Sequence, residues 1–207
     1  MLSYQVRSNR FPYRLRGELK WQNLGTRYVA ELSLGALGLN RQQQSRGQIL
    51  AHGLLQPERF SDSLHPEQAV HFDSALGRIH FGASHPDVNW VPGCQDRLSV
   101  LLQLGRLQAR LDALSPGHTV ELPTVGPGAL ESWSFVHQGL LRLDLPGGTI
   151  QAQAWKRAPR TPDDQQLWVW LAPEWDHFPV RLRILETNGD EVDQQITARR
   201  PLAAQGS

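Results

Sequence analysis

One segment, residues 95–107, predicts the single convincing α-helix in a chain that otherwise has the pattern of β-strands. Its apolar side chains point to several sides of the helix rather than forming one stripe, so most of its surface has to be buried. These side chains belong to Leu98, Val100, Leu101, Leu102, Leu104 and Leu107. A curled sheet that carries the helix on its concave side provides such cover. We therefore expect a buried helix near residues 95–112, with Asp96 or Gln95 accepting hydrogen bonds in its first turn.

The rest of the chain predicts short antiparallel strands. Apolar and charged side chains alternate with a period of two over residues 13–21, and apolar residues alternate again over 28–34 after a turn. Similar segments recur up to residue 199, separated by Gly, Pro, Asn and Asp. The polar, glycine-rich stretch 35–46 is interpreted as a loop or a frayed edge. The predicted fold class is mainly β: a curled antiparallel meander of about ten strands, as a barrel or half-barrel, because a sheet that long must curl or close.

One hairpin has a register that the sequence predicts well. If residues 74–77 form its loop, His71 lies opposite His80 and Asp73 lies opposite Arg78. His71, Asp73 and His80 then share a polar face, where two imidazoles and a carboxylate could converge on a metal ion. The competing interpretation is a solvated face, since the sequence ties no third histidine to the pair and catalytic zinc normally needs three protein ligands. We expect no metal.

Composition excludes several classes of protein. The 207 residues carry a formal net charge of +1, which argues against a nucleic-acid partner, and the single Cys94 excludes an internal disulfide or a cysteine-based zinc site. No apolar run predicts a transmembrane segment, and the first thirty residues lack the pattern of an export signal. No cofactor is expected, because no phosphate-binding glycine loop is present. We expect one β-rich domain over residues 1–200 and a disordered tail over 201–207.

A small group of residues offers acid–base chemistry. Glu174, Asp176 and His177 follow one another within a short segment that Pro173 and Pro179 bracket. Carboxylates beside an imidazole can act as a general acid and base, which is the basis for a hydrolase-type alternative. Residues adjacent in sequence rarely face one substrate, however, so a structural turn is the competing interpretation. No nucleophile motif is present, and we assign no catalytic residues.

Tryptophans are the stronger candidates for ligand binding. In the strand 167–171, Trp168 and Trp170 lie on the face opposite to the three aliphatic residues, so both faces are apolar. Trp133 and Trp155 on preceding strands could extend the same patch. The competing interpretation is packing of the core. The predicted ligand-binding set, which adds two leucines of the helix, is Trp133, Trp155, Trp168, Trp170, Leu98 and Leu101.

Four segments taken together resemble a known family: residues 55–60, 70–73, 95–101 (Gln-Asp-Arg-Leu-Ser-Val-Leu) and 167–171 (Leu-Trp-Val-Trp-Leu). The chain resembles the proteobacterial family defined by domain of unknown function 3108, over about residues 11–199. Members of that family typically begin with an export signal or a membrane anchor, so the resemblance implies a periplasmic or envelope location. This sequence shows no such segment, and a cytoplasmic location is the alternative. The resemblance brings no activity and no catalytic residues.

Three hypotheses about function follow. The first is a non-catalytic envelope protein that binds a hydrophobic small molecule, a lipid-like ligand or a lipidated protein on the concave side of the sheet. The second is an envelope scaffold with a filled core, and the third is the hydrolase-type enzyme. Empty space between the helix and the tryptophan strands would favour the first hypothesis, and tight packing there would favour the second.

Overall fold

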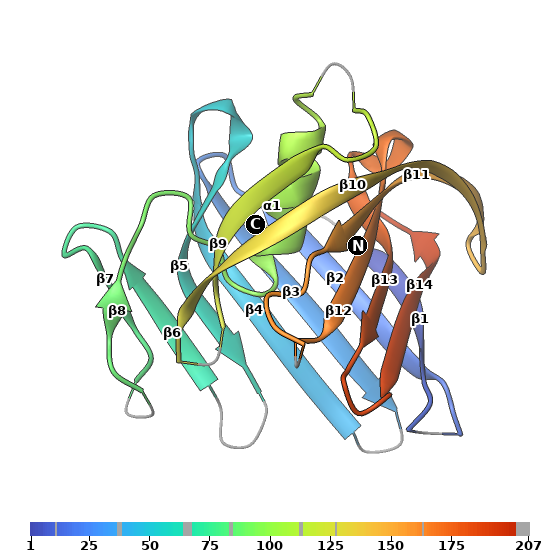
Figure 1. The fold of residues 1–207 in the computed structure, drawn as a ribbon, viewed down its shortest axis with the longest axis horizontal. Coiled ribbons are helices and arrows are strands. Elements are labelled where there is room, and N and C mark those ends of the chain that lie inside the picture. The colour runs from blue at the N-terminus through green and yellow to red at the C-terminus, as the bar shows by residue number, and fades with distance from the viewer. Residues whose placement is uncertain are drawn as a thin grey trace.

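The computed structural model describes residues 1–10, 12–36, 39–63, 68–82, 85–111, 114–126, 128–162 and 164–201. Within them the chain is mainly β: fourteen antiparallel strands form a single curled sheet that does not close, and one α-helix lies inside the curl (Figure 1). The predicted fold class is confirmed. The strands are β1 (Leu2–Ser8), β2 (Leu15–Asn23), β3 (Arg27–Ala36), β4 (Leu39–Ile49), β5 (Leu55–Asp62), β6 (Gln68–Asp73), β7 (Arg78–His80), β8 (Val88–Asn89), β9 (Thr119–Val125), β10 (Leu130–Leu145), β11 (Gly148–Arg157), β12 (Gln166–Ala172), β13 (Phe178–Leu185) and β14 (Glu191–Arg199).

The strand order is a meander that starts and ends in the middle of the sheet. Strand β1 pairs with β2 on one side and with β14 on the other, so that Leu2 lies between Leu19 and Arg199. From β2 the order runs outward to β8, and from β14 it runs outward to β9. The chain therefore has to pass from one edge of the sheet to the other between β8 and β9, and the helix lies on this crossing (Figure 1).

The helix α1 (Ser99–Gln108) begins with a reciprocal cap. Oδ1 of Asp96 accepts hydrogen bonds from the backbone N–H groups of Leu98 (2.8 Å) and Ser99 (2.7 Å), and the Ser99 hydroxyl accepts from the N–H of Asp96 (2.9 Å). This arrangement supplies acceptors for N–H groups that the helix itself leaves unpaired. The predicted role of Asp96 is confirmed, and α1 lies inside the predicted range 95–112 but is shorter.

The residues before α1 hold two distant strands together. The Gln95 backbone forms a short ladder with β9: its N–H donates to the Pro123 carbonyl and its carbonyl accepts from Val125, both at 2.8 Å. The Gln95 side-chain amide donates to the carbonyl of Leu55 on β5 (2.9 Å), and Gln103 of α1 accepts from the N–H of Leu55 (2.8 Å). The segment therefore links the edge strand β9 to β5 in the other half of the open sheet.

Two local predictions have different outcomes. The register of the β6–β7 hairpin is confirmed, since His71 pairs with His80 and Asp73 with Arg78. The loop or frayed edge predicted over residues 35–46 is wrong: β3 continues to Ala36, β4 begins at Leu39, and β4 lies inside the sheet. Polar residues form this strand because β3 and β5 flank it on both sides. Their side chains also find partners across the ladder, as Gln43 donates to Asp62 and Gln44 donates to Glu31.

Of the tail predicted over residues 201–207, only Pro201 is described, and residues 202–207 lie outside the described part of the chain. In the ranges that the structure describes, no helix is long and apolar enough to cross a membrane.

Candidate ligand-binding site

The four predicted tryptophans do not form one patch, and this part of the prediction is corrected. Trp155 pairs with Val169 across β11 and β12, so its side chain lies on the face opposite to Trp168 and Trp170. Trp133 joins Trp155 in a packed cluster on the helix side, together with Leu101 of α1. The prediction of one shared patch was wrong because residues paired across neighbouring strands lie on the same face of a sheet. Trp155 pairs with Val169, so it lies on the aliphatic face of β12 and not on the face of its tryptophans.

The space between α1 and the strands β9–β13 is filled. Val100, Leu104, Phe135, Trp155 and Val169 all have 0% of their surface exposed there. The Trp155 indole N–H donates to Oε1 of Gln108 on α1 at 2.7 Å, which satisfies the one polar atom of that ring. Leu98, the remaining predicted residue, is buried in the second cluster, on the side of β1–β7. Packing of this density leaves no room for a ligand.

Trp168 and Trp170 lie on the face of the sheet opposite to Trp155, beneath cationic side chains, where Trp170 is buried and Trp168 is partly buried. The ammonium of Lys156 lies 5.1 Å from the Trp168 ring centre, and the Arg181 guanidinium lies 4.8 Å from that of Trp170. Arg181 is also paired with Asp193 at 2.8 Å. These contacts make the two indoles part of a layer of cations stacked on aromatic rings.

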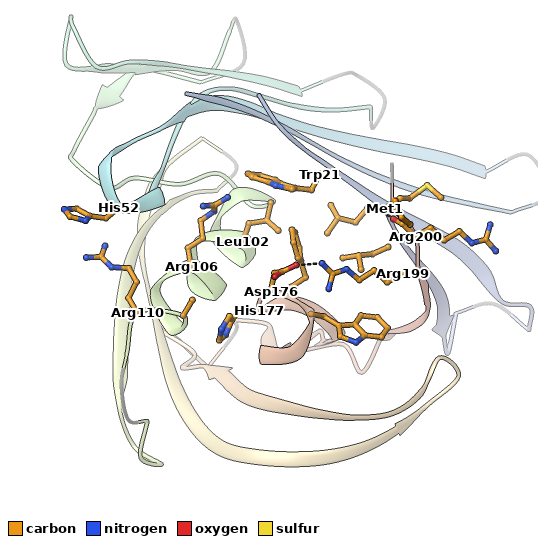
Figure 2. A pocket seen from close by; sticks show the side chains of 16 residues that line it. Met1, Trp21, His52, Leu102, Arg106, Arg110, Asp176, His177, Arg199 and Arg200 are labelled. Atoms are coloured by element: carbon orange, nitrogen blue, oxygen red, sulfur yellow. Dashed lines mark hydrogen bonds and ion pairs between the residues drawn. The ribbon is translucent and has the colours of Figure 1, made fainter. Parts of the chain in front are cut away.

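A cavity of about 1040 Å³ lies on the other side of α1, where none of the six predicted ligand-binding residues lies (Figure 2). Its lining comes from α1 and the two residues after it, from β1, β2 and the start of β13, from the single-turn helix η1 (Ala51–Gly53) and from the turn that contains η2 (Pro173–Trp175). Met1 and residues 199–201 complete the wall. The apolar part of the lining consists of Met1, Leu2, Leu19, Trp21, Leu102, Ala109, Trp175, Phe178 and Pro201.

One face of α1 supplies the polar and apolar groups on the helix side of the cavity. Leu102, Arg106 and Ala109 follow at positions i, i+4 and i+7, and Arg110 continues the row. Between them Gly105 lies so close to the η2 turn that a Cβ atom there would be 2.3 Å from the backbone oxygen of His177. The missing side chain of Gly105 therefore sets the distance between the helix and the turn.

Trp21 forms the aromatic wall opposite the helix. Its ring stacks on Tyr28 with centroids 5.3 Å apart and meets the edge of Phe178 at 6.2 Å. The Arg106 guanidinium lies over the Trp21 ring, 4.9 Å from its centre, and Nη1 of Arg106 donates to the Gly53 carbonyl at 2.7 Å. Burial lowers the pKa of Arg106 from its usual value, although the group stays charged.

His177 lines the cavity as a neutral imidazole. Because an indole can only donate, the Trp155 contact identifies the oxygen of the Gln108 amide, and the amide nitrogen is then the donor to Nδ1 of His177 at 2.7 Å. An Nδ1 that accepts a hydrogen bond carries no proton, so the proton lies on Nε2. Burial lowers the pKa of His177, which is consistent with the neutral form, while the charge of Asp176 acts in the opposite direction.

The second predicted group, Glu174, Asp176 and His177, is only partly brought together. Asp176 and His177 line the cavity, both with left-handed backbone conformations (φ 56° and 58°), while Glu174 does not line it. Asp176 is ion-paired with Arg199. The described lining contains no Ser, Thr, Cys, Tyr or Lys side chain.

His71 and His80 pair across β6 and β7 in the predicted register, but His80 and Asp73 each have a partner outside the predicted His71–Asp73–His80 group. His80 pairs with Asp87 at 2.7 Å, and Asp73 accepts from the N–H of Leu76 in the turn. Burial and the charges of Arg59, Arg46 and His80 lower the pKa of His71. Throughout the described ranges, no group of three or more His, Cys, Asp and Glu residues is arranged to hold a metal ion.

Two residues that line the cavity, Arg106 and Trp21, have sequence features that could have marked them as candidates. Arg106 is a lone charge within an otherwise apolar stretch of the helix, and Trp21 lies on the apolar face of an alternating strand. Neither feature identifies its partner, because the two residues are far apart along the chain.

Fold and cavity together define a β-barrel-like protein: an open, curled antiparallel sheet encloses one helix and leaves a mixed apolar and cationic cavity beside it. The chain belongs to the family described as protein of unknown function (DUF3108), whose model matches residues 4–197. This finding confirms the resemblance seen in the sequence.

Comparison with solved structures shows the same fold in another family. The chain is similar to the crystal structure of a β-barrel-like protein of domain of unknown function DUF1849 from Brucella abortus, with a TM-score of 0.55 and 8% sequence identity. The match covers 94% of each chain, so nearly the whole architecture is shared. At this identity the likeness shows the fold alone. Among curated proteins, no match was found.

Proposed function

We propose that this chain is a non-catalytic binding protein that holds an apolar or lipid-like ligand in the cavity between α1, β2 and the η2 turn. The observation that carries the proposal is the cavity itself, about 1040 Å³ in volume and walled mainly by apolar and aromatic side chains. Ligand sites typically have volumes of roughly 300–1,000 Å³ and a few polar groups among apolar ones. A single-chain lipid or a molecule of similar size fits that range.

The arrangement of the lining supports a ligand with a long apolar part. Leu19 and Trp21 on β2 face Leu102 on α1 across the cavity, and Phe178 extends the apolar wall from β13. Burying apolar surface releases about 25 cal/mol for each Å² removed from water, so an acyl chain in contact with these walls gains binding energy without any catalytic group.

Binding can be tested with a neutral reporter. N-phenyl-1-naphthylamine should become fluorescent on binding, and dodecanol should displace it, because neither molecule depends on charge. Replacing Ala109, an exposed cavity residue at the end of α1, by Trp should fill the space and weaken binding of the reporter by about tenfold or more, which equals at least about 1.4 kcal/mol.

Ala75→Trp is the matched control, since Ala75 lies in an exposed turn of the β6–β7 hairpin, away from the cavity. It should bind the reporter as the unmodified chain does. If the unmodified protein binds neither reporter nor dodecanol, or if the two tryptophan variants weaken binding equally, the cavity is not a binding site for apolar ligands.

The scaffold hypothesis keeps support from one observation, the filled space between α1 and β9–β13. In that case the function would reside on the surface loops and the cavity would stay filled with water. The reporter experiment separates the two hypotheses, since a scaffold predicts no saturable binding that responds to Ala109→Trp.

The proposal includes a location in the periplasm or elsewhere in the bacterial envelope. It is supported by the family resemblance, which implies an export signal or anchor on the native gene product. Fractionation of cells that express the native gene tests this part separately, and recovery of the protein in the cytoplasm alone would contradict it. A lipidated protein remains the alternative occupant under this proposal, because its acyl chain presents the same chemistry.

A further inference from the structure

We infer that the ligand of this cavity is an amphiphile with an oxyanion head, a carboxylate or a phosphate, and that Arg106 and Arg110 bind this head. The inference rests on the proposed function. It adds the charge of the ligand and the end of the cavity at which its head lies.

The cavity concentrates positive charge. Four arginines line it, Arg106, Arg110, Arg199 and Arg200, against one carboxylate, Asp176. The formal net charge of the whole chain is only +1, so this excess is local. A concave site whose charges share one sign raises the local concentration of ligands of the opposite sign.

The positive charge is not equally available at the two ends. At one end Arg199 is ion-paired with Asp176, as the dashed line in Figure 2 marks. At the other end Figure 2 shows Arg106 and Arg110 beside His52 of η1. The ion pairs of the described residues include none of Arg106, Arg110 and Arg200, but only Arg106 and Arg110 follow each other, four residues apart, on the α1 side of the cavity. An anionic head is therefore best accommodated at this second end.

Arg106 is held in position with donors to spare. Nη1 is anchored on the Gly53 carbonyl, and the guanidinium plane is supported by the Trp21 ring. A guanidinium has five N–H donors, and its fork matches the two oxygens of a carboxylate or phosphate. The lowered pKa of Arg106 has burial as its main cause, as expected for a half-buried cation without a carboxylate beside it.

The head and tail contacts adjoin each other. Leu102 lies one helical turn before Arg106 on the same face of α1, and Trp21 contacts Arg106 while forming part of the apolar wall. A ligand that places an oxyanion on Arg106 thus has apolar surface directly beside its first carbon atoms. This geometry favours an amphiphile over a free inorganic anion and over an uncharged lipid.

The test compares ligands that share one tail. Dodecanoate, dodecyl phosphate and dodecanol are titrated against the protein by calorimetry below their aggregation concentrations, with acetate and inorganic phosphate as heads without a tail. Both anionic amphiphiles should bind about 10- to 100-fold more tightly than dodecanol, the range expected for hydrogen bonds to a charged group. Acetate and inorganic phosphate should bind far more weakly than the amphiphiles.

Two variants locate the head. Arg106→Gln and Arg110→Gln should each lower the affinity for dodecanoate by a larger factor than the affinity for dodecanol, which brings the two affinities towards each other. Arg110→Gln should not change the stability of the fold, because Arg110 is exposed and no described side chain bonds to it. A loss of binding in this variant therefore reports on the ligand contact. Arg106→Lys should restore part of the preference for the anion. Arg142→Gln, on the exposed part of β10, is the matched control and should change nothing.

The outcomes separate the two proposals. Equal affinity for dodecanoate and dodecanol would overturn the anionic head and leave the proposed function standing. Absence of binding for every amphiphile would overturn the proposed function. Binding of inorganic phosphate as tightly as dodecyl phosphate would overturn the amphiphile in favour of a free anion. Equal loss of acid and alcohol binding in both glutamine variants would also overturn the role of the arginines.

Discussion

At the scale of single residues, the most consequential group is the fully buried Asp96. Its Oδ2 accepts from the Ser45 hydroxyl of β4 at 2.6 Å, and that hydroxyl lies 2.9 Å from the Tyr28 hydroxyl of β3. Together with the cap at Ser99, these bonds attach the start of α1 to strands β3 and β4. Burial raises the pKa of Asp96 above its ordinary value of 3.8, while the hydrogen bonds to Ser45 and Ser99 oppose that rise.

Replacing Asp96 by Asn should remove one component of the pH dependence of stability. Because the pKa of Asp96 is higher in the folded chain, the folded state binds more protons than the unfolded state just above pH 3.8. The contribution of Asp96 to stability is therefore complete below that pH and is lost as the pH rises through the raised pKa. Urea unfolding over a pH series should show this loss in the unmodified chain but not in Asp96→Asn.

Asp96→Ala serves as the comparison, since alanine cannot cap the helix. It should lower the free energy of unfolding by about 1–3 kcal/mol at every pH, from loss of the cap and of the Ser45 partner. Parallel pH profiles for the unmodified chain and Asp96→Asn would show that Asp96 does not titrate differently in the folded state.

At the scale of elements, the sequence predicted local features well where one element determines them. The cap at Asp96 and the His71–His80 register depend on residues a few positions apart, so a local pattern contains the information. The polar strand over 39–49 was missed because its stability comes from two neighbouring strands rather than from its own alternation. The contact between α1 and the η2 turn was also beyond the sequence, since Gly105 and His177 meet only in the folded chain.

Gly105→Ala tests that contact against helix propensity. Alanine is favoured over glycine in a helix interior by about 1 kcal/mol, so propensity alone predicts a more stable protein. The added Cβ would lie 2.3 Å from the His177 carbonyl oxygen, however, and a backbone atom cannot move aside cheaply. We expect a net loss of about 1–3 kcal/mol in urea unfolding, together with weaker binding of the neutral reporter. An equally stable or more stable variant would show that the turn can shift freely.

At the scale of the whole molecule, α1 is in contact with both arms of the meander. Its cap and Gln103 bind β4 and β5, while Val100 and Leu104 pack against β9–β13. The two arms meet again where β1 pairs with β14. The sheet is thus joined at its centre by the β1–β14 pair and across its open side by α1. Because neither arm can unfold without losing these contacts, we expect one domain over residues 1–200.

Leu104→Ala tests this cooperativity. Leu104 is completely buried between α1 and the tryptophan strands, so the truncation should cost about 2–5 kcal/mol. Tryptophan fluorescence and far-ultraviolet circular dichroism should nevertheless report the same unfolding midpoint, as expected of a two-state transition. Leu76→Ala, at a leucine that is 72% exposed, should change stability by less than about 0.5 kcal/mol. Different midpoints for the two signals would mean that the arms unfold independently.

The sequence by itself determined the class of fold, the position of the helix and the register of one hairpin, and it narrowed the capping residue to Asp96 or Gln95. These features follow from periods of two and of 3.6 residues and from turn chemistry, which all act over a few positions. The tertiary structure alone decided that β1 pairs with β14, that the chain crosses the open side at α1, and that the tryptophans are divided between two faces. It also assembled the cavity, because Trp21, Arg106 and His177 come from distant parts of the chain and meet only when the sheet curls around the helix. Such contacts depend on which strands pair, and no local pattern of residues specifies that pairing.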